Sequence, residues 1–443
     1  HLVPRDDIGV GLQFSYDEVE ILRRQIESGE IDRLSSRANK KHSTATFIPG
    51  EYVENRIDFE LVEQIIDQAH SNQQDSKVVL FALILNLLRR KNLASFAKLN
   101  NSRDLSYKND FIEQEVAWWL NETGVEIFNQ TYTQLLSLTL PENTDILGLI
   151  YQSIRLEGNK SASGAYYTPK DLVERMIRDS VTSDSFVLDP CCGTGQFLIA
   201  ASRVPVDPQN LWGFDLDEIA VRIARINLIL AYPDTNFTPN IFCQNTLFFE
   251  DRSLFSTQTL PLFDVVITNP PWGAHFSRDD SRRLKRIYSS VLSGESFSYF
   301  IMKALDLLRP QGKLSFLLPE SILNIKTHQD IRSFILSTTT IQTIEHLDRV
   351  FKNVFTPVVR IDLTKAKAAN NRFVAKCSTK TLTVDQARLE SNPGYSFDIF
   401  ANNSDLSLLK KIFQTPHTTL ANKADWALGI VTGNNKKYVL DCK

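Results

Sequence analysis

The stretch "VLDPCCGTGQFL", Val187 to Leu198, decides the fold class. Its apolar start predicts a buried strand that ends at Asp189, and "QFL" predicts the start of a helix. Gly193 and Gly195 lie between the two, where glycine permits a tight turn and a close backbone approach. A strand, a glycine turn and a helix in this order predict a nucleotide-like ligand at the carboxyl edge of a parallel sheet.

The turn differs from two common phosphate-binding patterns, because no third glycine follows at the dinucleotide spacing and no Walker lysine is present. A second acid, Asp215, ends the next predicted strand 22 residues after Gly193, where an acid is the expected partner of ribose hydroxyls. Asn245 ends the third predicted strand, and its amide could bind an adenine edge. Asp217 is better interpreted as a helix N-cap.

Alternating apolar runs and helical patterns continue to residue 364 and predict an open α/β sheet with crossover helices. The expected strands are Ser185–Asp189, Leu211–Asp215, Asn240–Asn245, Phe263–Thr268, Gly312–Leu318, Ile341–Asp348 and Val358–Thr364, the last two antiparallel. Before this region, from Ser15 to Ile154, the periodicity predicts helices. After Ala366 the periodicity weakens.

The amino-acid composition limits the classes of protein to which the chain can belong. A hydrophobic content of 42% and a charged content of 23% are typical of a soluble globular protein. The net charge of −3 means that a nucleic-acid partner must be bound by a local basic patch. The five cysteines form no CxxC pair, so we expect no metal site, no disulfide framework and a cytoplasmic location. The longest apolar run, Val78 to Leu88, is too short to span a membrane.

Three motifs together resemble a known family. "DPCCGTGQFL" resembles the S-adenosylmethionine motif of Class I methyltransferases, "TNPPW" resembles their Asn-Pro-Pro-aromatic motif, and "GAYYTP" precedes both. This order resembles the gamma group of DNA adenine-N6 methyltransferases of restriction–modification systems, over roughly Thr144 to Thr364. "DILGLIYQSI", "LPESIL" and "VFKNVFTPVV" are also similar to that family. This sequence departs from the family's pattern at Cys191 and Cys192, where Ala-Cys or similar small residues are usual, and we expect no redox role for them.

The resemblance implies a Class I methyltransferase fold, Rossmann-like and mostly parallel with an antiparallel edge, preceded by an α-helical domain. It implies transfer of a methyl group from S-adenosylmethionine to the 6-amino group of a flipped-out adenine in double-stranded DNA. The implied cofactor-binding residues are Tyr167, Thr168, Pro169, Asp189, Pro190, Gly193, Gly195, Asp215, Asn245 and Asn269.

The implied catalytic residues are Asn269, Pro270, Pro271, Trp272 and Phe351. Two acceptors, the Asn269 side-chain oxygen and the Pro270 carbonyl, would localise the lone pair of an amino group and stabilise its developing charge. Trp272 would stack on the base, with Phe351 on the opposite face by resemblance and Phe355 as the competing choice. The plain alternative for the motif is a rigid turn with a core indole.

A basic segment follows directly, "SRDDSRRLKRIY" from Ser277 to Tyr288. Its basic residues could hold DNA phosphates, and they are Arg282, Arg283, Lys285 and Arg286. The equally acceptable alternative is a solvated helix face with Asp279 and Asp280 as local partners.

The expected domains are a tag remnant at 1–5, an α-helical domain at 6–157, the methyltransferase domain at 158–365, a peripheral region at 366–425, and the start of a truncated target-recognition domain at 426–443. A specificity or restriction subunit or domain outside the chain is a further partner to consider, and no nuclease and no membrane contact are predicted. Alternative substrates are cytosine-N4 in DNA, an RNA base or protein glutamine. A last alternative is a cofactor-binding modification subunit that is inactive without partners.

Overall fold

The structure is a computed structural model, and it describes residues 60–66, 75–96, 105–124, 130–141, 145–154, 168–248, 253–255, 258–351, 356–378, 380–416, 418 and 423. Residues Thr46–Asp405 form one compact unit, to which the sheet, the site and the helices discussed below belong. A second unit combines His1–Ala45 with Leu406–Lys443. The predicted tag remnant, the helix expected from Ser15 and the segment 426–443 lie outside the described residues.

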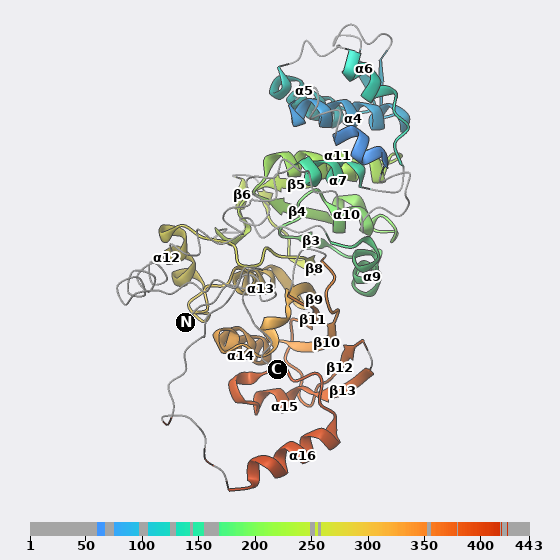
Figure 1. The fold of residues 1–443 in the computed structure, drawn as a ribbon. Coiled ribbons are helices and arrows are strands. Elements are labelled where there is room, and N and C mark those ends of the chain that lie inside the picture. Colours follow the sequence, from blue (N-terminus) through green and yellow to red (C-terminus); the bar gives the residue numbers. More distant parts are fainter. Residues whose placement is uncertain are drawn as a thin grey trace, which may run out of the picture. The chain divides into compact units, whose positions relative to one another are not determined.

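The main sheet has nine strands in the order β13-β12-β10-β11-β9-β8-β3-β4-β5 (Figure 1). Their bounds are β3 (Val187–Asp189), β4 (Leu211–Asp215), β5 (Asn240–Cys243), β8 (Phe263–Thr268), β9 (Leu308–Pro319), β10 (Thr340–His346), β11 (Val358–Thr364), β12 (Arg372–Cys377) and β13 (Lys380–Asp385). Strands β5, β4, β3, β8 and β9 pair in parallel, whereas β11 is antiparallel to both β9 and β10. The predicted mostly parallel sheet with antiparallel pairing toward one edge is therefore confirmed.

The central strands are apolar along their whole length because both faces of the sheet are covered. In β8, Val265 and Ile267 pack into one buried core with α9, α10 and α11, and Val266 packs into the other with α13 and α14. These helices are α9 (Lys170–Ser180), α10 (Gln196–Ala201), α11 (Glu218–Ala231), α13 (Ser296–Leu307) and α14 (Gln329–Thr338). Helices on both faces leave the loops at the carboxyl ends of the strands as the place for a site.

The described residues also form smaller elements and the helix α16. They are β6 (Ser253–Phe255), β7 (Gln258–Thr259), α12 (Arg278–Ile287), α15 (Gln386–Glu390), α16 (Asn403–Gln414), and the 3₁₀ turns η3 (Pro208–Asn210), η4 (Thr246–Phe248), η5 (Glu320–Leu323), η6 (Lys326–His328) and η7 (Pro393–Tyr395). Strands β12 and β13 continue the main sheet beyond residue 365, where the sequence predicts the methyltransferase domain to end. The sheet thus has no break at that predicted boundary.

The N-terminal region is helical, as predicted, with a helix at 60–66 followed by α4 (Ser76–Arg90), α5 (Asp110–Thr123), α6 (Gln130–Ser137) and α7 (Ile146–Ile154). A short hairpin of β1 (Ala94–Phe96) and β2 (Leu105–Tyr107), which the sequence does not predict, interrupts the helices. Residues of α4, α5 and α7 share one continuous core with α9, α10 and α11. The buried Glu115 of α5 also binds Arg222 and Arg225 of α11, each at 2.8 Å. The helices and the sheet therefore fold against each other within one unit.

Candidate cofactor and active site

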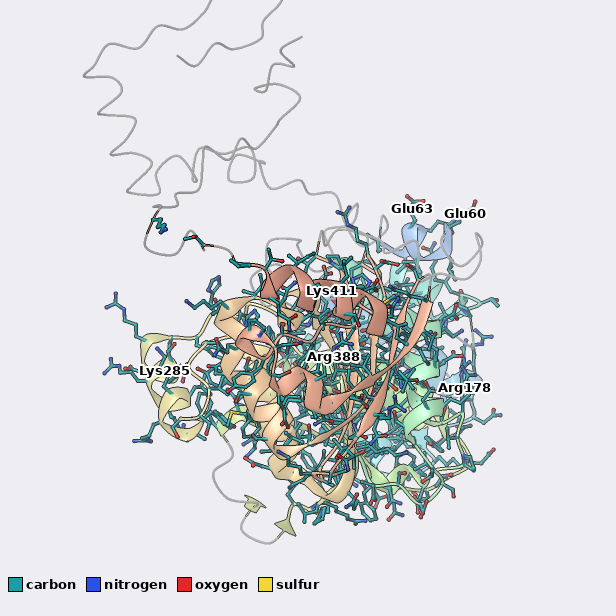
Figure 2. The ribbon with its side chains drawn as sticks, turned by 90° about the horizontal axis from the view of Figure 1, so that it is seen from below. Glu60, Glu63, Arg178, Lys285, Arg388 and Lys411 are labelled. Carbon is teal, nitrogen blue, oxygen red and sulfur yellow. The ribbon has the colours of Figure 1, made fainter. Side chains whose placement is uncertain are left out.

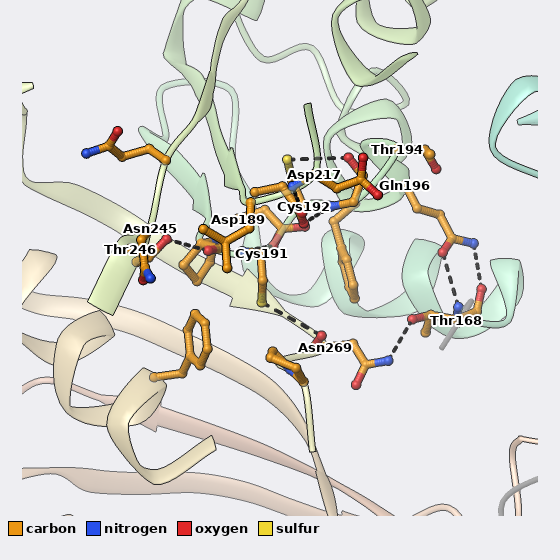
Figure 3. Close-up of a pocket in the computed structure, with 18 of the residues that line it drawn as sticks. Thr168, Asp189, Cys191, Cys192, Thr194, Gln196, Asp217, Asn245, Thr246 and Asn269 are labelled. Carbon is orange, nitrogen blue, oxygen red and sulfur yellow. Dashed lines mark hydrogen bonds between the residues drawn. The ribbon is translucent and has the colours of Figure 1, made fainter. Parts of the chain in front are cut away.

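A cavity of about 340 Å³ opens at the carboxyl ends of β3, β4, β5 and β8 (Figure 3). The sequence places most of the predicted site residues at these strand ends, because the carboxyl ends of parallel strands meet at one edge. The predicted residues that line the cavity are Thr168, Asp189, Pro190, Gly193, Asp215, Asn245, Asn269 and Pro271. Their shared location is what a single ligand site requires.

The glycine turn is held by the acid of the neighbouring strand. Gly193 and Gly195 have φ values of 52° and 90°, in the left-handed region that side chains rarely adopt. The Gly193 N–H donates to Asp215 Oδ2 at 2.8 Å. A Cβ built on Gly193 would meet no atom within 4 Å, so the space beside this residue is open. Gly195 does not line the cavity; a Cβ there would lie 3.1 Å from the Ala224 Cβ, so this glycine lets α10 approach α11.

Asp189 is the most deeply buried acid of the cavity, with 1% of its surface exposed. Its Oδ1 accepts from the Thr268 hydroxyl at 2.6 Å and from the Cys191 N–H at 3.2 Å. Burial raises the pKa of Asp189 to about 7, despite these two donors. Burial also raises the pKa of Asp215. Two acids with raised pKa values in one cavity are typical of a functional site.

Asn269 follows β8 directly, and its side chain is oriented by a hydrogen bond that it donates to another segment. The Asn269 Nδ2 donates to Thr168 Oγ1 at 3.2 Å, and its side-chain oxygen points away from Thr168 (Figure 3). Thr168 is held in turn by the side chain of Gln196, which accepts from the Thr168 N–H at 3.2 Å and donates to the Thr168 carbonyl at 2.5 Å. Pro169 serves as the N-cap of α9, and Tyr167 lies outside the described residues.

The Pro-Pro-Trp turn is fixed on both sides. Pro270 is buried, and the Pro271 carbonyl accepts from the Ser296 hydroxyl. The Trp272 indole N–H donates to the Leu317 carbonyl at 3.2 Å. Trp272 and Phe351 meet with ring centroids 5.5 Å apart and planes inclined by 71°. The structure thus brings the two predicted stacking residues together, in edge-to-face contact with each other. Phe355 lies outside the described residues.

The four predicted DNA-binding residues all lie exposed on α12. Arg282 pairs with Asp279 at 3.0 Å, and the Arg283 guanidinium lies 4.6 Å from the centroid of the Phe248 ring. Lys285 projects outward from the helix at the edge of the molecule (Figure 2). The arrangement fits both interpretations of the segment, because one arginine has the local acidic partner of a solvated face and the helix also presents exposed cations.

The cavity is also lined by residues that the sequence motifs do not single out. They are Gln152, Thr194, Gln196, Phe197, Leu216, Gln244, Thr246 and Phe300. Leu216 directly follows Asp215 and is 69% exposed, so its position after the acid that is predicted to bind the ribose was a usable signal. Gln152 and Phe300 come from α7 and α13, and no local pattern connects these helices with the glycine turn.

The described part of the chain contains no group of three or more His, Cys, Asp or Glu side chains that could hold a metal ion. None of its helices combines the length and the apolar character needed to cross a lipid bilayer.

The sheet order and the strand-end cavity define the Class I S-adenosylmethionine-dependent methyltransferases. The residues fit this cofactor, since open space beside Gly193 admits a ligand next to the backbone and two acids face the same cavity. Residues 142–417, more than half of the 443, match the N-6 DNA Methylase family, and the chain belongs to this family. S-adenosylmethionine is accordingly its cofactor, as the sequence predicts. The narrower assignment to the gamma group stays a prediction.

Relatives and solved structures agree with this family. The chain is 31% identical over 297 residues to the Type II methyltransferase M.VspI of Vibrio sp. (strain 343), covering 66% of this chain and 70% of the relative. It is 25% identical to the Type II restriction enzyme and methyltransferase RM.BcgI of Heyndrickxia coagulans, covering 65% of this chain but only 45% of the relative. A modification subunit of a putative type I restriction enzyme from Vibrio vulnificus YJ016 has the same fold, with a TM-score of 0.51, 14% identity, and coverage of 90% of this chain and 100% of that one.

Proposed function

We propose that this chain transfers a methyl group from S-adenosylmethionine to the 6-amino group of an adenine that is flipped out of DNA, within a restriction–modification system. The observation that carries the proposal is the position of Asn269. It lies at the end of β8, lines the cofactor cavity, and has its amide oriented by Thr168. A cytosine-N4, RNA or protein glutamine substrate would use similar amine or amide chemistry, so these alternatives become outcomes of the test.

The chemistry follows from the weakness of the nucleophile. An adenine 6-amino group reacts poorly because its lone pair is delocalised into the ring. Hydrogen bonds from this group to the Asn269 side-chain oxygen and the Pro270 carbonyl would localise the lone pair and stabilise the positive charge that develops on nitrogen. The proline rings restrict φ, so the carbonyl is in place before the base arrives. When bound, S-adenosylmethionine supplies an electrophilic methyl group on a good leaving group.

Entry of the base requires a change in the aromatic pair. A duplex hides the amino group, so the adenine must leave the stack at a cost of a few kcal/mol. Stacking on an aromatic side chain returns about 1–3 kcal/mol per base. Trp272 and Phe351 now contact each other edge to face, so we propose that Phe351 moves away from Trp272 to admit the base between them.

The contacts to DNA are proposed from the position of α12, and those to other proteins from the similarity to subunits of restriction enzymes. The exposed cations of α12 follow the catalytic turn directly and are proposed to hold phosphates. Replacing Lys285 and Arg286 together by alanine would then make the negative slope of log binding constant against log salt shallower by about two units. Several relatives are named as methylase subunits of type I restriction enzymes, for example the MjaIX methylase subunit of Methanocaldococcus jannaschii. We therefore propose that target recognition involves a specificity subunit, or the target-recognition domain predicted to begin near residue 426.

The test is Asn269→Ala in a filter assay that follows tritiated methyl groups into unmethylated DNA, with and without a specificity subunit. We expect the methylation rate to fall by a factor of about 10² or more, the typical effect of removing one such stabilising group. The cofactor dissociation constant should change far less than the methylation rate, since the other residues that line the cavity remain. The matched control is Asn240→Ala, because Asn240 is the first residue of β5, at the end of the strand away from the cavity, and donates to the Gln209 carbonyl at 2.8 Å.

The labelled product decides between substrates. Digestion of the DNA to nucleosides should give labelled N6-methyladenine, whereas labelled N4-methylcytosine, or label only in added RNA or protein, would favour the corresponding alternative. An Asn269→Ala protein that methylates adenine at the normal rate would return the Pro-Pro-Trp segment to the role of a rigid turn.

A further inference from the structure

Helix α7 carries the segment "DILGLIYQSI", residues 145–154, for which the cofactor site and the catalytic turn assign no role. The helix lies outside the sheet and packs against both α4 and α11. One of its residues, Gln152, lines the cofactor cavity directly. The side chains on either side of this contact bind the two loops that form the cavity.

Asp145 binds the glycine turn through Thr194, the residue between the two glycines. Its Oδ2 accepts from the Thr194 hydroxyl at 3.0 Å, and its Oδ1 accepts from the Gly148 N–H at 2.8 Å and from Asn227 Nδ2 at 2.7 Å. Asn227 Nδ2 also donates to the Thr194 carbonyl at 3.0 Å. Both the hydroxyl and the carbonyl of Thr194 are therefore held by this buried cluster.

Gly148 shows how closely α7 approaches the turn. A Cβ at this position would lie 2.1 Å from Asp145 Oδ2 and 2.3 Å from Thr194 Oγ1, closer than such atoms can come. The hydrogen bond between Asp145 and Thr194 thus passes over a residue where only glycine fits. The glycine of "DILG" is explained by this contact and not by an unusual backbone angle.

Tyr151, six residues after Asp145, binds the other loop. Its hydroxyl donates to Asp217 Oδ2 at 2.6 Å. Asp217 caps α11 through Oδ1, and its own N–H donates to Asp215 Oδ1 at 3.0 Å. Tyr151 is therefore linked through a single residue, Asp217, to Asp215, the acid that is expected to bind the ribose.

We propose that α7 is a brace for the cofactor site, in which Asp145 holds the Gly193–Gly195 turn and Tyr151 holds the Asp215–Asp217 loop in the conformation that binds S-adenosylmethionine. Both are positioning residues, because each acts through another residue. Two loops that are already ordered lose less conformational entropy when the ligand binds, which favours affinity. The inference rests on the proposed cofactor site, and it makes the N-terminal helices part of that site.

The test measures the dissociation constant of S-adenosylmethionine by calorimetry on the full chain. Tyr151→Phe removes one hydroxyl and keeps the ring, and we expect about tenfold weaker binding, the usual loss for one hydrogen bond to a charged acceptor. Asp145→Ala should weaken binding by at least the same factor. Asp145→Asn should bind within about threefold of the unmodified protein, because its amide can keep all three contacts and burial already raises the pKa of Asp145 to about 6. The control is Ser153→Ala, which removes a buried hydroxyl of the same helix that donates only to the Leu149 carbonyl at 2.7 Å.

The outcomes distinguish the loss of the brace from a general loss of stability and from a wrong assignment of the cofactor site. Weak binding by Tyr151→Phe with normal binding by Ser153→Ala, at melting temperatures that match, supports the brace, and rescue by Asp145→Asn supports it further. If Tyr151→Phe binds as tightly as Ser153→Ala, or if both lose affinity equally, the brace is overturned. Asp215→Ala tests the underlying site, since undiminished cofactor binding by that variant would refute the site and not merely the brace. If Asp145→Ala does not fold, Tyr151→Phe decides.

Discussion

Lowering the pH from 8 to 6 should weaken the binding of S-adenosylmethionine about tenfold, because Asp189 takes up a proton. Burial raises the pKa of this acid to about 7, and the charge of Asp215 adds to the effect. With that pKa, about nine-tenths of the carboxyl is ionised at pH 8 and about one-tenth at pH 6. The cofactor carries positive charge, so it binds the ionised form, and binding releases a proton at pH values below 7. The sign is therefore a loss of affinity as the pH falls through 7.

The measurement is isothermal titration calorimetry at pH 6, 7 and 8, in two buffers with different heats of protonation, which counts the protons released. We expect close to one proton released at pH 6 and almost none at pH 8. Asp189→Asn should bind weakly at every pH and show no such dependence. A dissociation constant that is constant within twofold across this range would refute the reasoning. An unchanged pH dependence in Asp189→Asn would assign the proton to another group, with Asp215 the first candidate because burial raises its pKa as well.

Three substitutions test the framework of the site. Gly195→Ala should lower the free energy of unfolding by about 1–3 kcal/mol, since a Cβ there lies 3.1 Å from the Ala224 Cβ and φ is 90°. Urea unfolding measures this free energy, and an unchanged value would contradict the close packing of α10 against α11. Gly193→Ala should cost about 1 kcal/mol of backbone strain but should weaken cofactor binding more strongly, because its Cβ enters open space beside the cavity; calorimetry showing normal binding would argue against a ligand there. Glu115→Ala should cost about 3–5 kcal/mol by leaving Arg225 of α11 without its carboxylate, and a urea midpoint unchanged from the parent would show that this ion pair contributes nothing.

The strands were predictable where an apolar run is buried on both faces. The bounds of β4, β8 and β11 agree residue for residue with the predicted segments Leu211–Asp215, Phe263–Thr268 and Val358–Thr364. Strand β9 begins at Leu308, before the predicted Gly312, because "LRPQ" carries no strand pattern and is recruited by pairing with a neighbour. Strands β12 and β13 were not predictable for a similar reason, since several of their residues are exposed or half-exposed.

The same difference applies to the site, where residues at strand ends could be predicted and contacts between separate elements could not. The residues at strand ends could be predicted because the topology of a parallel sheet gathers them at one edge. The bonds of Gln196 to Thr168 and of Asp145 to Thr194 join residues 28 and 49 positions apart. Such side-chain contacts between separate elements follow no period in the sequence, so only the folded chain reveals which glutamine and which aspartate hold the site.

The core shared by α4, α5, α7 and α11 has a consequence for protein engineering. A fragment cut at the predicted boundary of residue 157 would remove the apolar partners of α11, the carboxylate that binds its arginines and the helix that contacts the glycine turn. A chimera that exchanges catalytic modules between relatives should therefore join the chains before Thr46, where the compact unit begins, and carry the helices together with the sheet. Grafts that respect this border should express as folded protein, whereas grafts at residue 157 should accumulate as insoluble aggregates.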